Sequence, residues 1–456
     1  MDPIYDWISY ALKAKFEDLP IGTVDVIKNT VVDTLGVALA GSGSEGIGAL
    51  LSLVKDWGGK HEASVIAYGG KVPAPVAALV NGSMARACDF DEVHENGGGH
   101  LSATTVPAAF ALAEYCNKPV NGRDFILISA LCSEINCRIR IASGSPTGWL
   151  HETFAPIGVA VMGSKLLGFD ESKMQNAIGI AFAQCSGNGQ AMLDGAMTTR
   201  LQQGLGASAG VLSMLLAERG FTGAKNVFLG KYGLFHLYAN GQYDPKVFLG
   251  DIGKHFEFIN SSIKPYPCCK MTHTAIFSVI EITREYNIKP NDISKIVITT
   301  NSFAFNLCAL GDHKYNIKTI QDAQFSLPYT VSVAILNQKV TFADFTTEAI
   351  KNNDVLMLAK KIKVILDPNK DKQNAFVCPA DVEIFTIDGR QYSKTTEFIK
   401  GHPKNRFTFD ECVEKFMECS HRAVRPLSND NLNKAIKLVE RLEQLDDVTE
   451  IIKLLS

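Results

Sequence analysis

Six side chains that can accept or donate protons lie within residues 89–100, DFDEVHENGGGH. The segment combines four carboxylates with two histidines: Asp89, Asp91, Glu92, Glu95, His94 and His100. The three glycines before His100 can adopt positive φ at little cost, which suits a loop that bends tightly around a ligand. The small residues after His100 are typical of a helix start, whose free N–H groups can bind an anion. The segment therefore indicates acid/base chemistry beside a site for a carboxylate.

Two plainer interpretations of this loop stay open. A loop rich in Asp, Glu and Gly is often only a solvated turn, in which Asp91 and Glu92 would cap or solvate the backbone. Two histidines among four carboxylates could also hold a metal ion. The spacing matches neither a zinc motif nor an EF-hand, so we predict no metal site.

The composition is that of a soluble globular protein with more than one domain. The 456 residues exceed the size of one ordinary core, and 46% of them are hydrophobic while 20% are charged. A net charge of −3 without a basic block argues against nucleic acid as a partner. The N-terminal MDPIYDW lacks the features of a signal peptide, and no apolar run is long enough to span a membrane. We therefore expect neither nucleic acid nor a membrane as a partner.

The cysteines indicate a reducing compartment. Eleven are scattered along the chain, an odd number, and none belongs to a CxxC pair. This usage suits free thiols better than a disulfide framework or a structural zinc site. We therefore predict a cytoplasmic protein.

Most of the chain has helical periodicity. Thr23 is placed to cap a helix over residues 23–41, whose apolar residues recur on one face. From residue 104 to 220, Ala- and Gly-rich segments are apolar on more than one face, which predicts helices buried within a helical domain. One segment contains GLGASAG at 204–210. No strand precedes this phrase, so we interpret its glycines as close helix packing rather than a dinucleotide fingerprint.

The pattern changes in the last third of the chain. Runs rich in Val, Ile and Thr predict strands at 294–303, 361–367 and 381–401. Asp388-Gly389 lies inside the last run and predicts a hairpin turn.

These patterns together predict a mainly α fold with two domains. The large all-helical domain is expected to comprise residues 1–258 and, after the chain returns to it, 403–456. A smaller α+β lid domain, residues 259–402, is inserted between these two parts.

Several motifs resemble the MmgE/PrpD family, in the right order and over nearly the whole chain. Besides residues 89–100 they are TGWLHETFAPIGVAVMGSKLLGFD (147–170), GAMTTRLQQGLGASAGVLSMLLAERGFTG (195–223) and KPYPCCKMTH (264–273). The family includes 2-methylcitrate dehydratases, cis-aconitate decarboxylases and an iminodisuccinate epimerase. The resemblance implies a helical domain with a smaller lid, a homodimer and no required cofactor.

The resemblance also assigns roles to individual residues. Asp89 matches the first Asp of the family's DFDD motif and is expected to act in catalysis or to orient His100, which matches a catalytic histidine. Lys264, which opens KPYP, and His151 are expected to bind substrate. Tyr329 matches a tyrosine near the site that can donate a hydrogen bond.

Three positions depart from the family pattern. Thr199 stands where the decarboxylases have a substrate-binding lysine, and the neighbouring Arg200 could bind the carboxylate with its two-pronged guanidinium. Cys269 stands where they have a second catalytic histidine, and beside Lys270 its thiol could act as an acid or base. Val93 replaces a common threonine, and His94 could partly substitute for it.

The leading hypothesis is a cofactor-independent lyase acting on a small di- or tricarboxylate. His100 would transfer a proton α to a carboxylate, with Cys269, His94 or Tyr329 as its acid/base partner. Lys264, Lys270, Thr199 and Arg200 would contact the substrate. The departures favour a 2-methylcitrate dehydratase-related hydratase or dehydratase over a cis-aconitate-type decarboxylase. An epimerase or racemase of an imino- or amino-dicarboxylate and a non-enzymatic binding protein are the alternatives.

Overall fold

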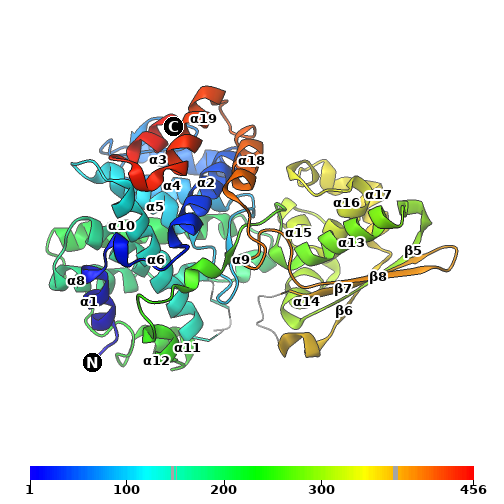
Figure 1. Cartoon of the computed structure of the whole chain (residues 1–456), viewed down its shortest axis with the longest axis horizontal. Coiled ribbons are helices and arrows are strands. Elements are labelled where there is room, and N and C mark those ends of the chain that lie inside the picture. The colour runs from blue at the N-terminus through cyan, green and yellow to red at the C-terminus, as the bar shows by residue number, and fades with distance from the viewer. Residues whose placement is uncertain (145–147, 150, 373–377) are drawn as a thin grey trace. The chain divides into compact units, whose positions relative to one another are not determined.

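A computed structural model of the chain describes residues 1–144, 148–149, 151–372 and 378–456 (Figure 1). The fold is mainly α, as predicted, and helices greatly outnumber short strands. The chain divides into two compact units. Unit 1 comprises Met1–Ala191, Met197–Ser261 and Phe407–Ser456, and unit 2 comprises Met192–Ala196 and Ser262–Arg406. The predicted domain boundaries, after residues 258 and 402, stay a prediction.

Unit 1 is built almost entirely from helices. Its helices are α1 (Ile4–Lys13), α2 (Thr23–Gly41), α3 (Ile47–Trp57), α4 (Ala74–Arg86), α5 (Ser102–Tyr115), α6 (Gly122–Ala142), α7 (Ala155–Leu166), α8 (Glu171–Phe182), α10 (Thr198–Glu218), α11 (Leu234–Ala239), α12 (Pro245–Leu249), α18 (Phe409–Ser420), α19 (Asn429–Glu440) and α20 (Thr449–Leu454). The short helix α9 (Gln190–Leu193) crosses the unit boundary. The strands are equally short: β1 (Ala63–Ser64) pairs antiparallel with β2 (Lys71–Val72), β3 is Val93–His94, and β4 (Ser261–Ser262) lies at the boundary.

The start of α2 differs from the prediction. The helix begins at Thr23, but the capping position is Gly22, whose φ is 85°. A glycine adopts this left-handed conformation without a Cβ penalty. Thr23 is therefore the first residue inside the helix, its side chain is buried, and it makes no cap.

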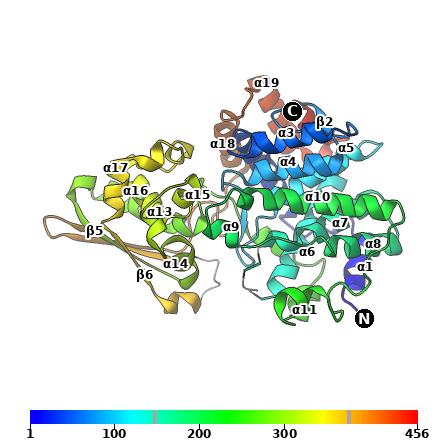
Figure 2. The same ribbon diagram turned by 180° about the vertical axis from the view of Figure 1, so that it is seen from behind.

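Close packing between α4 and α10 explains the glycine-rich phrase at 204–210. Figure 2 shows the two helices side by side. A Cβ on Gly204 would lie 2.2 Å from the carbonyl oxygen of Leu79, and a Cβ on Gly82 would lie 2.9 Å from the Cα of Gly204. Only glycines permit this approach of the two backbones, so the prediction of helix packing is confirmed.

Unit 2 combines a small sheet with helices, as the strand-rich sequence predicts. Four strands lie in the order β6 (Ile362–Leu366), β5 (Ile293–Thr300), β7 (Ala380–Thr386) and β8 (Gln391–Thr396). The β5–β6 pair is parallel and the other two pairs are antiparallel. Gly389, with a φ of 84°, closes the β7–β8 hairpin at the predicted turn. The helices are α13 (His273–Glu285), α14 (Ser302–Cys308), α15 (Ile320–Gln324), α16 (Leu327–Asn337) and α17 (Asn353–Ala359).

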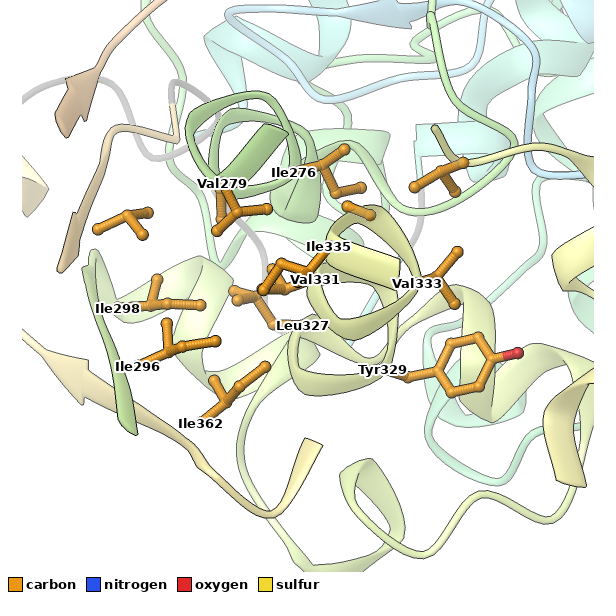
Figure 3. Packing of buried hydrophobic residues seen from close by; sticks show 14 of the residues in the cluster. Ile276, Val279, Ile296, Ile298, Leu327, Tyr329, Val331, Val333, Ile335 and Ile362 are labelled. Atoms are coloured by element: carbon orange, nitrogen blue, oxygen red, sulfur yellow. The ribbon is translucent and has the colours of Figure 1, made fainter. Parts of the chain in front are cut away.

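The core of unit 2 lies between its sheet and its helices. Figure 3 shows Ile296 and Ile298 of β5 facing side chains of α13 and α16, among them Val279 and Val331. Alternate residues of β7 are buried, as expected for a strand with one face on a core.

The cysteines and the helix lengths bear on two further expectations, free thiols and no membrane span. None of the eleven cysteines, all of which lie in the described ranges, forms a disulfide, as predicted. Within those ranges no helix combines the length and the apolar character needed to cross a bilayer.

Candidate active site

His100 is held beside Asp91 in unit 1. Its Nδ1 lies 2.9 Å from Oδ2 of Asp91, an ion-pair distance, although the ring N–H does not point along a hydrogen bond. The Asp91 side chain is fully buried and the imidazole is 14% exposed. The other ring nitrogen, Nε2, has no hydrogen-bond partner among the residues that the structure describes. This arrangement places a carboxylate beside one nitrogen of the imidazole and leaves the other nitrogen able to exchange a proton.

The partner of His100 differs from the expectation. The sequence predicts that Asp89 orients the histidine, but Asp89 forms its ion pair with Arg86, at the end of α4. Asp89 has a φ of 50°, a backbone conformation that few residues other than glycine adopt. Its side chain is therefore turned toward the preceding helix end, and Asp91 takes the position beside the imidazole.

Arg86 links the two carboxylates. Its Nη1 contacts Oδ1 of Asp89 and lies 3.4 Å from Oδ1 of Asp91, and the side chain is 4% exposed. A buried guanidinium of this kind compensates two carboxylates that would otherwise repel each other. Arg86 is not predicted from the sequence; its spacing of three residues from Asp89, at a helix end, is the available signal.

A lysine from the far end of the chain anchors the same loop. Lys415 of α18 donates a 2.8 Å hydrogen bond to the carbonyl oxygen of Phe90, between Asp89 and Asp91. Its Nζ also lies 2.7 Å from Oδ1 of Asp33 on α2 and 3.7 Å from the centre of the Phe90 ring. The C-terminal helices of unit 1 therefore help to fix the loop that carries the proposed acid/base groups.

The predicted carboxylate site at the start of α5 is already filled by the protein. The backbone N–H and the hydroxyl of Ser102 donate to Oε2 of Glu92 at 3.0 and 2.9 Å, and the Ser261 hydroxyl donates to Oε1 at 2.7 Å. Burial raises the pKa of Glu92 above its ordinary value, while these hydrogen bonds oppose the rise. The expectation that this helix start seats a substrate carboxylate is therefore wrong, and so is the solvated-turn interpretation, because Asp91 and Glu92 are both buried.

Both ring nitrogens of His94 form hydrogen bonds with the backbone. Its Nδ1 accepts a 3.0 Å hydrogen bond from the N–H of Gly97, so Nε2 carries the proton that it donates to the carbonyl of Glu257 at 2.8 Å. Both ring nitrogens therefore serve the backbone of unit 1. This geometry gives no support to the predicted catalytic role, because no ring nitrogen remains for a substrate.

Arg200 lies near the same loop, in the first turn of α10. It is half-buried, its Nη1 donates to the carbonyl of Glu45 at 3.2 Å, and burial lowers the pKa of its guanidinium. Asp89 is among the groups that act on it electrostatically. Thr199 beside it is buried. The side chain of His151 lies outside the described residues.

The remaining predicted residues belong to unit 2. Lys264 is 1% exposed. Cys269 is 6% exposed and belongs to the hydrophobic core of this unit, while Lys270 is half-buried. The N–H of Cys269 donates to the carbonyl of Gln324 at 2.9 Å. Burial and a hydrogen bond with the Cys269 thiol hold the pKa of the neighbouring Cys308 well above its ordinary value.

The Tyr329 side chain of α16 packs in the core of unit 2. Its hydroxyl donates a 2.6 Å hydrogen bond to the carbonyl oxygen of Asp344, and the side chain is 1% exposed. Burial raises the pKa of this phenol. Because its proton is already donated to the backbone, the geometry does not favour Tyr329 as an acid, and its catalytic role stays a prediction.

No group of three or more His, Cys, Asp or Glu side chains in the described part of the chain is arranged to hold a metal ion. The residues present instead offer buried carboxylates, one partly exposed histidine and several cations. They suit proton transfer on an anionic substrate.

Comparison with known proteins covers almost the entire chain. Residues 7–246 match the MmgE/PrpD N-terminal domain and residues 266–442 match the MmgE/PrpD C-terminal domain. A cis-aconitate decarboxylase-like protein of Aspergillus oryzae is 25% identical over 99% of this chain and 96% of its own length. The cis-aconitate decarboxylase of Aspergillus terreus is 25% identical over 96% of this chain and 93% of its own length. The human cis-aconitate decarboxylase is 25% identical over 94% of this chain and 89% of its own length.

Proposed function

This chain belongs to the MmgE/PrpD family of enzymes, and from that premise we propose that it is a cofactor-independent lyase acting on a small di- or tricarboxylate. The reaction transfers a proton at the carbon α to a carboxylate and releases a small neutral molecule.

The pairing of His100 with Asp91 carries this proposal. The carboxylate of Asp91, 2.9 Å from Nδ1, favours a proton on that nitrogen and leaves the lone pair on Nε2 to accept the substrate proton. Once Nε2 has taken the proton, Asp91 stabilises the positive charge on the ring. The Arg86 guanidinium, which contacts both neighbouring aspartates, offsets the repulsion between their carboxylates.

The developing negative charge on the substrate needs cations. Arg200 and Lys264 are the proposed carboxylate ligands, because a guanidinium and an ammonium form charge-assisted hydrogen bonds with carboxylates. Of the three predicted acid partners, Cys269 is retained, since His94 and Tyr329 donate to backbone carbonyls. Thr199, Lys270 and His151 stay predictions as further substrate contacts.

Loss of water is the leading assignment, and loss of CO₂ is the second. The decarboxylase-like pattern is interrupted at Thr199 and Cys269, which favours dehydration. The names of the relatives favour decarboxylation, since each of those given above is a cis-aconitate decarboxylase or a protein like one. From the family resemblance we also propose that the protein is a homodimer and that it is cytoplasmic. Light scattering of the purified protein would test the dimer.

Proton NMR of the purified enzyme in D₂O, with cis-aconitate, citrate, 2-methylcitrate, malate-type hydroxy acids and iminodisuccinate, tests the proposal. New vinyl or methylene signals identify a lyase and its leaving group. An α-proton signal that fades without a new product would replace the lyase with an epimerase. Unchanged spectra for every compound would contradict the proposal.

A further inference from the structure

Besides Lys264, unit 2 contains a second lysine whose side chain is almost completely buried. Lys314, in the short 3₁₀ turn Asp312–Lys314, is only 3% exposed. Its ammonium forms no hydrogen bond or ion pair with any residue that the structure describes. Lysine side chains are almost never buried to this extent unless they are paired. The described residues around Lys314 therefore provide no carboxylate that pairs with it.

The surroundings of Lys314 connect it with the proposed reaction. Its charge acts on the thiol of Cys308, a fully buried residue at the end of α14, and Cys308 in turn contacts the thiol of Cys269. Cys308 is not a counter-ion, because burial keeps its thiol protonated. Lys314 thus belongs to the same group of side chains as Cys269, one of the proposed acid/base residues.

The backbone fixes the lysine in this place. The carbonyl of Lys314 accepts a hydrogen bond from the Ser326 hydroxyl, which also caps α16 by accepting from the N–H of Tyr329 at 3.0 Å. Gln324, two residues before Ser326, accepts from the N–H of Cys269 and donates to the carbonyl of Pro267 at 3.1 Å. One short segment therefore holds both Lys314 and the chain around Cys269.

We propose that Lys314 binds a carboxylate of the substrate and so helps to select polycarboxylates. This inference rests on the proposed function for the identity of the ligand. An anionic ligand supplies the missing counter-charge, and a charge-assisted hydrogen bond in poorly hydrated surroundings is stronger than one at the surface.

This role predicts opposite effects on stability and on binding. Lys314→Met retains the length of the side chain and removes the uncompensated charge, so the ligand-free protein should melt at a slightly higher temperature than the wild type. The same substitution should weaken binding. A lysine with a structural role would instead lower the melting temperature when replaced.

Isothermal titration calorimetry of the full chain with citrate as the probe, together with thermal melting without citrate, tests the proposal. For Lys314→Met we expect a Kd for citrate raised by about tenfold or more, as for the loss of one charged hydrogen bond. Lys318→Met is the matched control, because Lys318 is exposed four residues further along. It should bind citrate and melt like the wild type.

The outcomes separate this site from the reaction. An unchanged Kd in Lys314→Met, a lowered melting temperature of that variant, or no citrate binding by the wild type would each overturn the role of Lys314. Citrate binding that depends on Lys314, in a protein that converts none of the compounds tested by NMR, would support the site and overturn the proposed reaction. Turnover whose KM is the same in Lys314→Met and the wild type would support the proposed reaction and overturn the site at Lys314.

Discussion

His100 and Asp91 face each other across 2.9 Å, with the carboxylate fully buried and the imidazole partly exposed. The two residues are nine positions apart, on either side of three consecutive glycines. Because Asp91 lies on the buried side of the ring, the nitrogen that remains for chemistry is Nε2. This relationship gives the histidine both an orientation and a charge partner.

Asp91→Asn should therefore impair the chemical step. The amide has the same size but cannot stabilise the protonated ring, so we expect kcat to fall by about 10²-fold, at the lower end of a general acid/base contribution, with a smaller change in KM. Steady-state kinetics on the substrate found by NMR measures both. A wild-type kcat in Asp91→Asn would refute the pairing, and a loss confined to Asp89→Asn would restore Asp89 as the orienting residue.

The anchor between Lys415 and the Phe90 carbonyl leads to a second prediction. Lys415→Met removes the 2.7 Å partner of the buried Asp33 carboxylate, and we expect the free energy of unfolding to fall by about 3–5 kcal/mol. Lys434→Met removes an ion pair of the same 2.7 Å length from the exposed surface of α19 and should change stability by less than about 1 kcal/mol. Urea unfolding compares the two variants, and equal effects would show that burial of the pair does not matter.

Helix packing at Gly204 can be tested with a pair of glycine substitutions. Gly204→Ala places a methyl group 2.2 Å from the Leu79 carbonyl oxygen, so α4 and α10 must move apart, at a cost of about 1–3 kcal/mol or more. Gly48→Ala in α3 meets no atom within 4 Å and should be neutral or stabilising by up to about 1 kcal/mol. Chemical unfolding of both variants measures the difference. A neutral Gly204→Ala would mean that the two helices do not approach so closely.

The buried Glu92 should make stability depend on pH. Burial raises its pKa above the ordinary value of 4.5, so the folded protein retains a proton that the unfolded chain releases. This contribution is complete below pH 4.5 and is lost as the pH rises through the folded-state pKa. Relative to Glu92→Gln, the wild type should lose up to about 1.4 kcal/mol per pH unit above pH 4.5. Urea unfolding at several pH values gives both curves, and parallel curves would contradict the raised pKa.

Backbone features with a local cause were predictable from the sequence. The Asp388-Gly389 turn requires positive φ at its glycine, and the strands on either side alternate in burial, so the hairpin follows from a few adjacent residues. The glycines of 204–210 were interpretable in the same way, because no strand precedes them. The helical character of unit 1 followed from periodicity alone.

The side-chain partners in the loop were not predictable, because they depend on distant chain and on unusual backbone. The positive φ of Asp89 decides that this residue meets Arg86 and that Asp91 meets His100. The His94 ring donates a hydrogen bond to the carbonyl of Glu257. The carbonyl of Phe90 accepts one from Lys415, which lies 325 residues further along the chain. Motif spacing identifies which residues gather in the loop, but it does not specify their directions.

The central claim is that His100 moves the proton at the carbon α to a carboxylate. The most direct measurement follows, by proton NMR in D₂O, the rate at which wild type and His100→Gln convert the substrate or exchange its α-proton, with substrate binding checked by calorimetry. The account predicts a rate about 10²- to 10⁴-fold lower in His100→Gln while the substrate still binds. A His100→Gln enzyme that works at the wild-type rate would contradict it.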